Sequence, residues 1–161
     1  MMTLARFTEI WTSGDYPPQP VTEADLRMVE QRLNVHLPDD YRQAVLQVGL
    51  PRPTLALMDA IVEHELDLYS LGDFYSPAEI IEETLSWREM GMPEQLVVFA
   101  NDGCGNKFCF DTDRQNNSSA EGLGIWFYDH DLQTVDRIAL SFDAWISAFC
   151  HVEPLREADL K

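Results

Sequence analysis

Basic residues are scarce in this chain. Its 161 residues include 11 Lys and Arg against 28 Asp and Glu, which gives a formal net charge of −17. Nucleic acids and anionic membranes are bound through clusters of Lys and Arg, so this balance argues against both as partners. The same charge would instead speed association with a basic protein. Solubility is the alternative explanation, because a high net charge keeps a folded protein dispersed.

Cysteine is also sparse, and long apolar runs are missing. Cys104, Cys109 and Cys150 are an odd number without a C-x-x-C pair, which gives little support to structural disulfides or a zinc knuckle. No stretch approaches the roughly 18 apolar residues of a membrane span. The N-terminus lacks the basic and apolar regions of a signal peptide. We therefore expect a cytoplasmic protein, and we expect Cys109 to pack as a small hydrophobe.

The common motifs of enzymes are missing as well. The sequence contains no P-loop, no G-x-S-x-G and no H-E-x-x-H. Asp129-His130-Asp131 could form a metal or acid–base trio, but the same residue types make ordinary turns at strand ends. No second group of ligands accompanies them, and Glu63-His64-Glu65 is a weaker case of the same kind. We predict no catalytic residues, no metal and no cofactor; an enzyme built on residues 129–131 is the alternative.

The sequence does contain a succession of helix and strand patterns. Capping residues, apolar spacing and Pro or Gly breaks predict helices at residues 4–11, 22–34, 39–48, 77–90 and 142–150. Apolar runs predict strands at residues 66–71, 96–100, 108–110, 124–129 and 135–139, and residues 54–62 form a strand or a buried connector. This order predicts a single α+β domain, with a twisted, mostly antiparallel sheet of about five or six strands and helices packed on it.

We place this domain at residues 21–152. An N-terminal helix and Pro-rich arm precede it at residues 1–20, and a charged tail follows at residues 153–161. The Asn-Asp-Gly-x-Gly-Asn turn at residues 101–106 supplies the positive-φ positions that a tight hairpin needs. The three tryptophans at positions 87, 126 and 145 fall on faces that we expect to be buried.

Five segments, taken in order, resemble the SUKH superfamily. The stretch from Val21 through Leu37-Pro38-Asp39-Asp40-Tyr41 is similar to its opening helix and L-P-x-D/E-Y motif. Residues 74–83 resemble its middle helix, residues 99–111 its central hairpin, residues 125–130 its aromatic strand ending in Asp-His, and residues 141–145 its closing helix. Residues 48–53 depart from the pattern, since a Pro-rich link stands where the family often has an Asn-Gly-Gly type turn.

The superfamily includes fungal regulators of cell-wall synthesis and many bacterial immunity proteins. The resemblance implies a non-enzymatic cytoplasmic immunity protein that binds and neutralises a cognate toxin, commonly a nuclease or another nucleic-acid-modifying enzyme. The net charge fits a basic toxin. The alternative is a regulatory or scaffold module that binds proteins of an endogenous pathway.

Acidic and aromatic side chains expected outside the core are the candidates for partner binding. They are Asp39, Asp40, Glu63, Glu65, Asp67, Tyr69, Asp73 and Tyr75. Charged groups would set the rate and register of association, while an aromatic ring would anchor it. The alternative for each carboxylate is an ordinary solvated surface group. The sequence does not decide between a monomer and a weak dimer.

Overall fold

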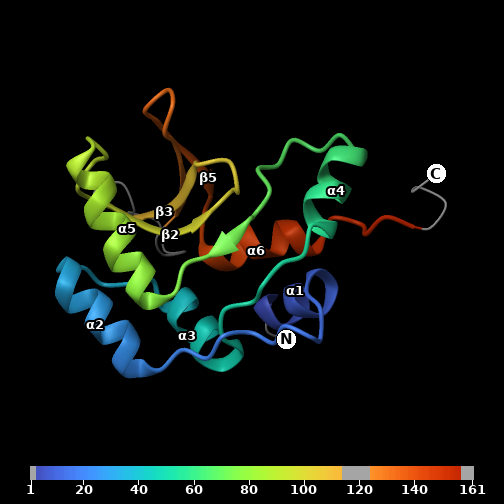
Figure 1. The fold of residues 1–161 in the computed structure, drawn as a ribbon, viewed down its shortest axis with the longest axis horizontal. Coiled ribbons are helices and arrows are strands. Elements are labelled where there is room, and N and C mark those ends of the chain that lie inside the picture. Colours follow the sequence, from blue (N-terminus) through green and yellow to red (C-terminus); the bar gives the residue numbers. More distant parts are fainter. Residues whose placement is uncertain (1–2, 114–123, 157–161) are drawn as a thin grey trace.

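The computed structural model describes residues 3–113 and 124–156 (Figure 1). Its helices are α1 (Thr3–Trp11), α2 (Glu23–Leu33), α3 (Asp39–Val48), α4 (Ala56–Glu63), α5 (Pro77–Glu89) and α6 (Phe142–Cys150). Its strands are β1 (Asp73–Phe74), β2 (Leu96–Asn101), β3 (Lys107–Asp111), β4 (Ile125–Asp129) and β5 (Thr134–Ala139). Within the described residues, no helix is both long and apolar enough to cross a membrane. Residues 157–161 of the predicted charged tail lie outside the described residues.

The strands form one antiparallel sheet in the order β1-β2-β3-β4-β5. Each strand pairs with the next one along the chain, and tight turns join β2 to β3 and β4 to β5. The predicted single α+β domain with an antiparallel sheet is therefore confirmed, with five strands among the described residues.

Helices cover both faces of the sheet. Lys107 of β3 lies against Trp87 of α5, whereas its neighbour Phe108 lies against Trp145 of α6. Since consecutive side chains of a strand point to opposite faces, α5 and α6 pack on opposite sides of the sheet. Strands β2 and β3 are consequently buried along nearly their whole length. This explains why they appear in the sequence as continuous apolar runs rather than as alternating ones.

An aromatic cluster fills the space between the sheet, α3 and α6. The rings of Phe99 and Phe110, on neighbouring strands, stack with centroids 4.0 Å apart. Tyr41 of α3 meets Phe110 edge-on at 5.1 Å, and Trp145 of α6 meets Phe99 edge-on at 5.3 Å. Each such pair contributes roughly 0.5–1.5 kcal/mol beyond the burial of its area. The cluster therefore fixes α3 and α6 against the same part of the sheet.

The predicted capping residues begin and end the helices. Thr22 and Ser76 each accept a hydrogen bond from the backbone N–H three residues on, while Asp25 and Glu79 accept one from the N–H of the capping residue. These are two complete capping boxes, which satisfy donors that a helix N-terminus would otherwise leave free. Asn34 follows the last residue of α2 and caps the helix with a φ of 53°.

Helix α1 packs against α6, at the other end of the chain (Figure 1). Its Leu4, Phe7 and Trp11 are buried. The indole N–H of Trp11 donates to the carbonyl oxygen of Phe149 at a distance of 3.0 Å. A buried indole requires such an acceptor, so this contact positions the N-terminal helix on the core.

The predicted strand at residues 66–71 is wrong. The segment is extended but pairs with no strand of the described sheet. Leu71 is buried and Leu68 partly buried, while the ring of Tyr69 stacks on Phe127 of β4. The alternating pattern therefore reflects side chains that pack inward from a connecting segment, and a ladder of backbone hydrogen bonds is not needed to produce it.

Residues 54–62 contain helix α4 instead of a strand. Leu57, Ala60 and Ile61 are buried, at the spacing of one helical face. The remaining apolar residues of the run point to solvent and hide this period in the sequence.

The expected burial of the three tryptophans also needs a correction. Trp145 is buried as predicted, whereas Trp87 and Trp126 are only partly buried.

Candidate functional site

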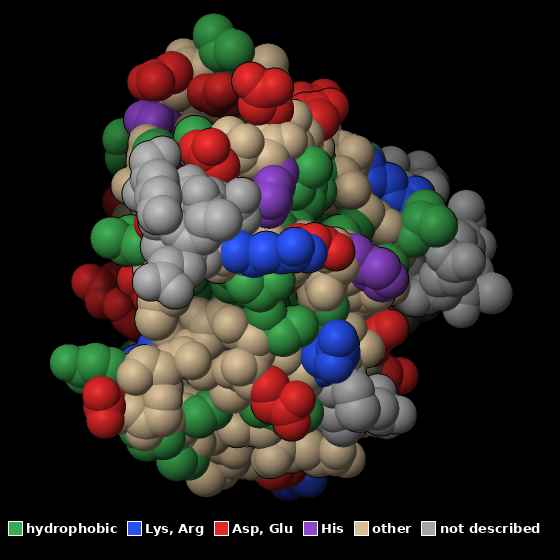
Figure 2. Space-filling view, turned by 90° about the vertical axis from the view of Figure 1, so that its right-hand side faces the viewer, with side chains coloured by type: hydrophobic (Ala, Val, Ile, Leu, Met, Phe, Trp, Pro, Cys, Tyr) green, Lys and Arg blue, Asp and Glu red, His purple; other side chains and the backbone are tan. Residues whose placement is uncertain are grey.

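Four of the six candidate carboxylates lie, together with Asp59, on one segment, residues 59–73, which we call the acidic segment. It contains Asp59, Glu63, Glu65, Asp67 and Asp73, all exposed, and it has no Lys or Arg. It runs from the second half of α4 to the first residue of β1. Figure 2 shows the side of the molecule that carries α4, where acidic side chains gather in the upper part with apolar ones among them. Most of the predicted partner-binding residues are thus contiguous.

The end of α4 orients the first of these carboxylates. The N–H groups of His64 and Leu66 donate to the carbonyl oxygens of Ala60 and Ile61, which closes the last turn of the helix. Glu65, which lies between them, has a backbone φ of 53°, a value that residues other than Gly and Asn rarely adopt. A ring nitrogen of His64 lies 3.0 Å from the carbonyl oxygen of Glu153. This contact ties the helix end to the chain beyond α6.

Tyr69 fixes the second half of the acidic segment to the sheet. Its ring lies flat on Phe127, with centroids 3.8 Å apart and planes inclined by 5°, yet the side chain stays 50% exposed. Beside it is a cavity of about 480 Å³. The cavity is lined by Asp67, Leu68, Tyr69, Ile138, Ala139, Ala144, Trp145, Ala148 and Phe149. The acidic segment therefore forms one wall of a cavity whose other walls are β5 and α6, and whose lining is apolar and aromatic apart from Asp67.

Sequence reasoning missed these β5 and α6 residues. Ala144 and Ala148 recur at helical spacing beside the large Trp145 and Phe149, and small residues next to large ones can leave a hollow in a helix face. That signal is weak, because the cavity also needs residues 67–69 to cross the same face. No pattern in the sequence shows that they do.

Asp39 and Asp40 have different surroundings from the acidic segment. Asp40 accepts hydrogen bonds from the N–H groups of Tyr41 and Asp143 at 2.9 and 3.0 Å, so it caps the first turn of α6. Burial raises the pKa of the Asp40 carboxyl above its usual value, and these two bonds offset only part of the rise. Asp39 is exposed and lies 3.5 Å from His36. Asp40 is thus engaged inside the protein.

Tyr75 is not at the surface, which corrects the expectation that it lies outside the core. It is 7% exposed, and its hydroxyl oxygen accepts a hydrogen bond from Nζ of Lys107 at 2.7 Å. The same ammonium group lies 5.3 Å from the ring centroids of Tyr75 and Trp87. A buried ammonium group needs such partners, so Tyr75 stabilises Lys107 and is unavailable to another protein.

Asp73 is exposed at the start of β1. Partial burial and repulsion from Glu79 raise the pKa of its carboxyl, while Arg52 opposes the rise. The side chain therefore already has a cation, Arg52, near it.

The Asp129-His130-Asp131 trio brings its ligand atoms within 4.8 Å of one another. Oδ1 of Asp129 accepts hydrogen bonds from the N–H groups of Asp131 and Leu132. These bonds stabilise the turn between β4 and β5. Nδ1 of His130 lies 2.7 Å from the amide oxygen of Asn106 in the neighbouring hairpin. The trio thus connects two adjacent turns.

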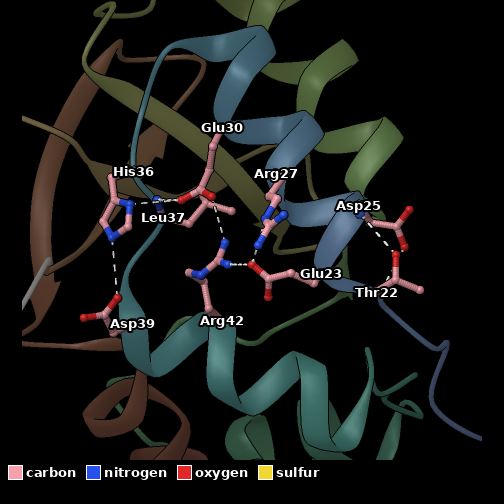
Figure 3. A network of polar contacts seen from close by, with 9 residues as sticks. All are labelled: Thr22, Glu23, Asp25, Arg27, Glu30, His36, Leu37, Asp39 and Arg42. Carbon is pink, nitrogen blue, oxygen red and sulfur yellow. Dashed lines mark hydrogen bonds and ion pairs between the residues drawn. The ribbon is translucent and has the colours of Figure 1, made fainter.

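A second group of charges joins α2 to α3 (Figure 3). Arg42 lies between Glu23 and Glu30, with Nη1 2.8 Å from Oε1 of Glu30 and Nη2 in contact with Glu23. The second oxygen of Glu30 accepts the N–H of Leu37 at 2.9 Å and lies 3.2 Å from His36. Both oxygens of Glu30 are thus occupied, and the network holds the two helices and their linker together.

Fold and site together define an α+β domain with an exposed acidic segment that borders a cavity. The model of the SMI1 / KNR4 family (SUKH-1) matches residues 20–148, and the chain belongs to this family. Proteins of the family are generally not catalytic, and membership is consistent with an immunity-like or a regulator-like role. No curated protein matches the chain.

Proposed function

We propose that this chain is a non-enzymatic immunity protein that acts in the cytoplasm. It binds a cognate bacterial toxin, a basic nuclease-type effector, and neutralises it by occupying the surface that the toxin uses for nucleic acid. The acidic segment makes the first contact with the toxin. The protein uses no metal or cofactor, because inhibition by occupation needs no chemistry.

Family membership and charge support this proposal independently. The SMI1 / KNR4 family accommodates an immunity-like role. A net charge of −17 speeds encounter with a basic protein, since complementary potentials steer diffusion. A nuclease must carry basic groups to hold phosphates, so it offers the complementary charge.

The observation that carries the proposal is the exposure of Glu63, Glu65 and Asp67 on a stretch without Lys or Arg. Carboxylates that are already paired within a protein contribute little to a partner, because a new contact must first break the old one. These three have no cation within their own segment. Glu63 and Asp67 sit on either side of Glu65, so three negative charges are presented within five residues.

The direct test is binding to the protein encoded by the adjacent gene, carried out with a catalytically inactive variant of that protein. We expect a one-to-one complex that weakens steeply between low and high salt, because exposed charge pairs are screened. Titrated against the active toxin, the chain should abolish nucleic-acid cleavage sharply at one equivalent, which separates stoichiometric inhibition from turnover.

Absence of a complex at low salt would contradict the immunity function and favour the regulatory module. Binding that is insensitive to salt would keep the immunity function but remove its electrostatic basis. If this chain abolished the toxin's nucleic-acid cleavage at well below one equivalent, the chain would act as an enzyme on the toxin.

A further inference from the structure

Helix α4 turns apolar side chains to solvent. Leu55, Met58 and Val62 are spaced three and four residues apart and are 71%, 41% and 70% exposed. We call these three residues the α4 apolar row. The opposite face of the helix, with Leu57 and Ile61, is already buried in the core. A surface helix normally presents polar residues outward, so an apolar outer face indicates a surface that another molecule covers.

The cavity beside Tyr69 begins a few residues after this row along the chain. Helix α4 ends at Glu63, and Asp67, four residues further, is the first residue that lines the cavity. Four residues span at most roughly 14 Å of extended chain, and the exposed Leu66 lies between. Trp145 and Phe149 of α6 are among the residues that line the cavity. Its volume, about 480 Å³, is in the range of a site for a bulky apolar group.

Charge decides what kind of molecule covers this surface. Along the chain, Glu63 and Glu65 stand between the row and Asp67, the first residue of the cavity lining, and no Lys or Arg belongs to the segment. A second copy of the chain would bring like charges together, and nucleic acid would be repelled in the same way. A protein segment with Lys or Arg next to an apolar side chain matches both features.

We propose that the α4 apolar row and the cavity form one docking surface for a basic segment of a partner protein. A large apolar side chain of that segment enters the cavity between Tyr69 and α6. Its Lys or Arg residues lie against Glu63, Glu65 and Asp67, and its remaining apolar surface covers the row. This inference rests on the proposed function for the identity of the partner and specifies where on the chain the partner binds.

The arrangement has the anatomy of a protein interface. An apolar centre excludes water and supplies most of the affinity, while charged groups at the rim set the rate and register of association. Tyr69, which lines the cavity and is half exposed, provides an aromatic contact of the kind that dominates such centres.

A peptide titration followed by ¹H–¹⁵N NMR of the full chain tests this surface. The probe is the acetylated, amidated peptide Arg-Lys-Leu-Phe-Lys-Arg, compared with Arg-Lys-Ser-Ser-Lys-Arg. We expect saturable shifts in residues 66–69, 138–139 and 144–149 with the first peptide. The serine peptide should bind at least about tenfold more weakly, a difference of about 1.4 kcal/mol.

Three variants separate the apolar from the charged contribution. Ala144→Phe fills the cavity from its exposed rim and should weaken peptide binding about tenfold. Met58→Ser with Val62→Ser removes two of the three side chains of the row, both at exposed positions, and should weaken peptide binding severalfold. Met28→Ser with Leu132→Ser removes exposed apolar side chains elsewhere and should change nothing.

Equal binding of the two peptides, shifts centred away from the cavity, or no saturable shifts would overturn the proposal. Concentration-dependent dimerisation that Met58→Ser with Val62→Ser abolishes would also overturn it, since the occupant would then be a second copy. Binding of the adjacent-gene protein is measured separately on the wild type. If the adjacent-gene protein does not bind but the peptide gives the expected shifts, the immunity function is wrong and the docking surface stands. If the adjacent-gene protein binds but the peptide does not give these shifts, only the docking surface is wrong.

Discussion

Two acidic regions of this molecule differ in whether their carboxylates are paired with a cation. Between α2 and α3, Glu23 and Glu30 close on Arg42, whose side chain is only 15% exposed (Figure 3). In the acidic segment, Glu63, Glu65 and Asp67 face solvent, and none of the salt bridges found among the described residues involves them. The first region uses charge to join elements of the fold. The second leaves its carboxylates outside every salt bridge found among the described residues.

This difference shows that net charge alone does not locate a binding surface. A carboxylate held by a partly buried Arg contributes to folding, and removing its partner leaves a charge poorly solvated. An exposed carboxylate without a partner contributes almost nothing to stability, but it contributes to the field that a distant charged protein encounters. Whether a carboxylate is paired within the fold therefore decides whether it contributes to stability or to the field around the molecule.

The largest expected effect is in the α2–α3 network. Arg42→Met should lower the free energy of unfolding by about 3 kcal/mol, the lower end of the range for breaking a buried ion pair, because Glu23 is partly exposed. Urea denaturation measures the change. Arg27→Met is the matched control, since Arg27 pairs with Glu23 at the surface and should contribute less than about 1 kcal/mol. Equal effects of the two substitutions would show that the network does not hold the helices together.

The acidic segment should show the opposite response. Glu63→Gln with Asp67→Asn should slow association with the adjacent-gene protein about tenfold at low salt, because steering charges are removed. Its unfolding free energy should stay within about 0.5 kcal/mol of the wild type. Glu82→Gln with Glu89→Gln makes the same change in net charge on exposed positions of α5. If both pairs slow association equally in stopped-flow measurements, the acidic segment has no special position and the field of the whole molecule acts.

Tyr69 connects the two properties, since it packs on the sheet and also borders the cavity. Tyr69→Ala should lower the free energy of unfolding by about 1 kcal/mol, because the stacked contact with Phe127 is lost. Hydrogen exchange of the backbone in residues 66–70 should become faster, since no strand pairing holds this segment. Tyr69→Phe keeps the stack and should match the wild type in both measurements. Unchanged exchange in Tyr69→Ala would mean that Leu68 and Leu71 suffice to fix the segment.

Features that depend on neighbours along the chain could be predicted from the sequence. The capping boxes at Thr22 and Ser76 and the hairpin at residues 101–106 each need residues only a few positions apart. The cavity depends on residues 67–69 meeting α6, about 75 positions later, and neither segment carries a signal of the other. Tyr75 is a similar case, because its burial depends on Lys107 of β3. Helix α4 could not be recognised from the sequence for a different reason. An amphipathic helix is normally recognised by polar residues between its apolar ones, and in α4 exposed apolar side chains occupy many of those positions.

The smallest expected effect concerns Asp40, a carboxylate of α3 that belongs to neither region. Burial raises its pKa above the usual value of 3.8, so the folded state favours the protonated form. The stability that this group contributes is fully present below the unfolded pKa and is lost as the pH rises through the folded pKa. Relative to Asp40→Asn, the wild type should therefore lose unfolding free energy between acid and neutral pH. A difference between the two that rises with pH would mean that the bonds from Asp143 and Tyr41 outweigh burial, and that Asp40 acts as a charged cap of α6.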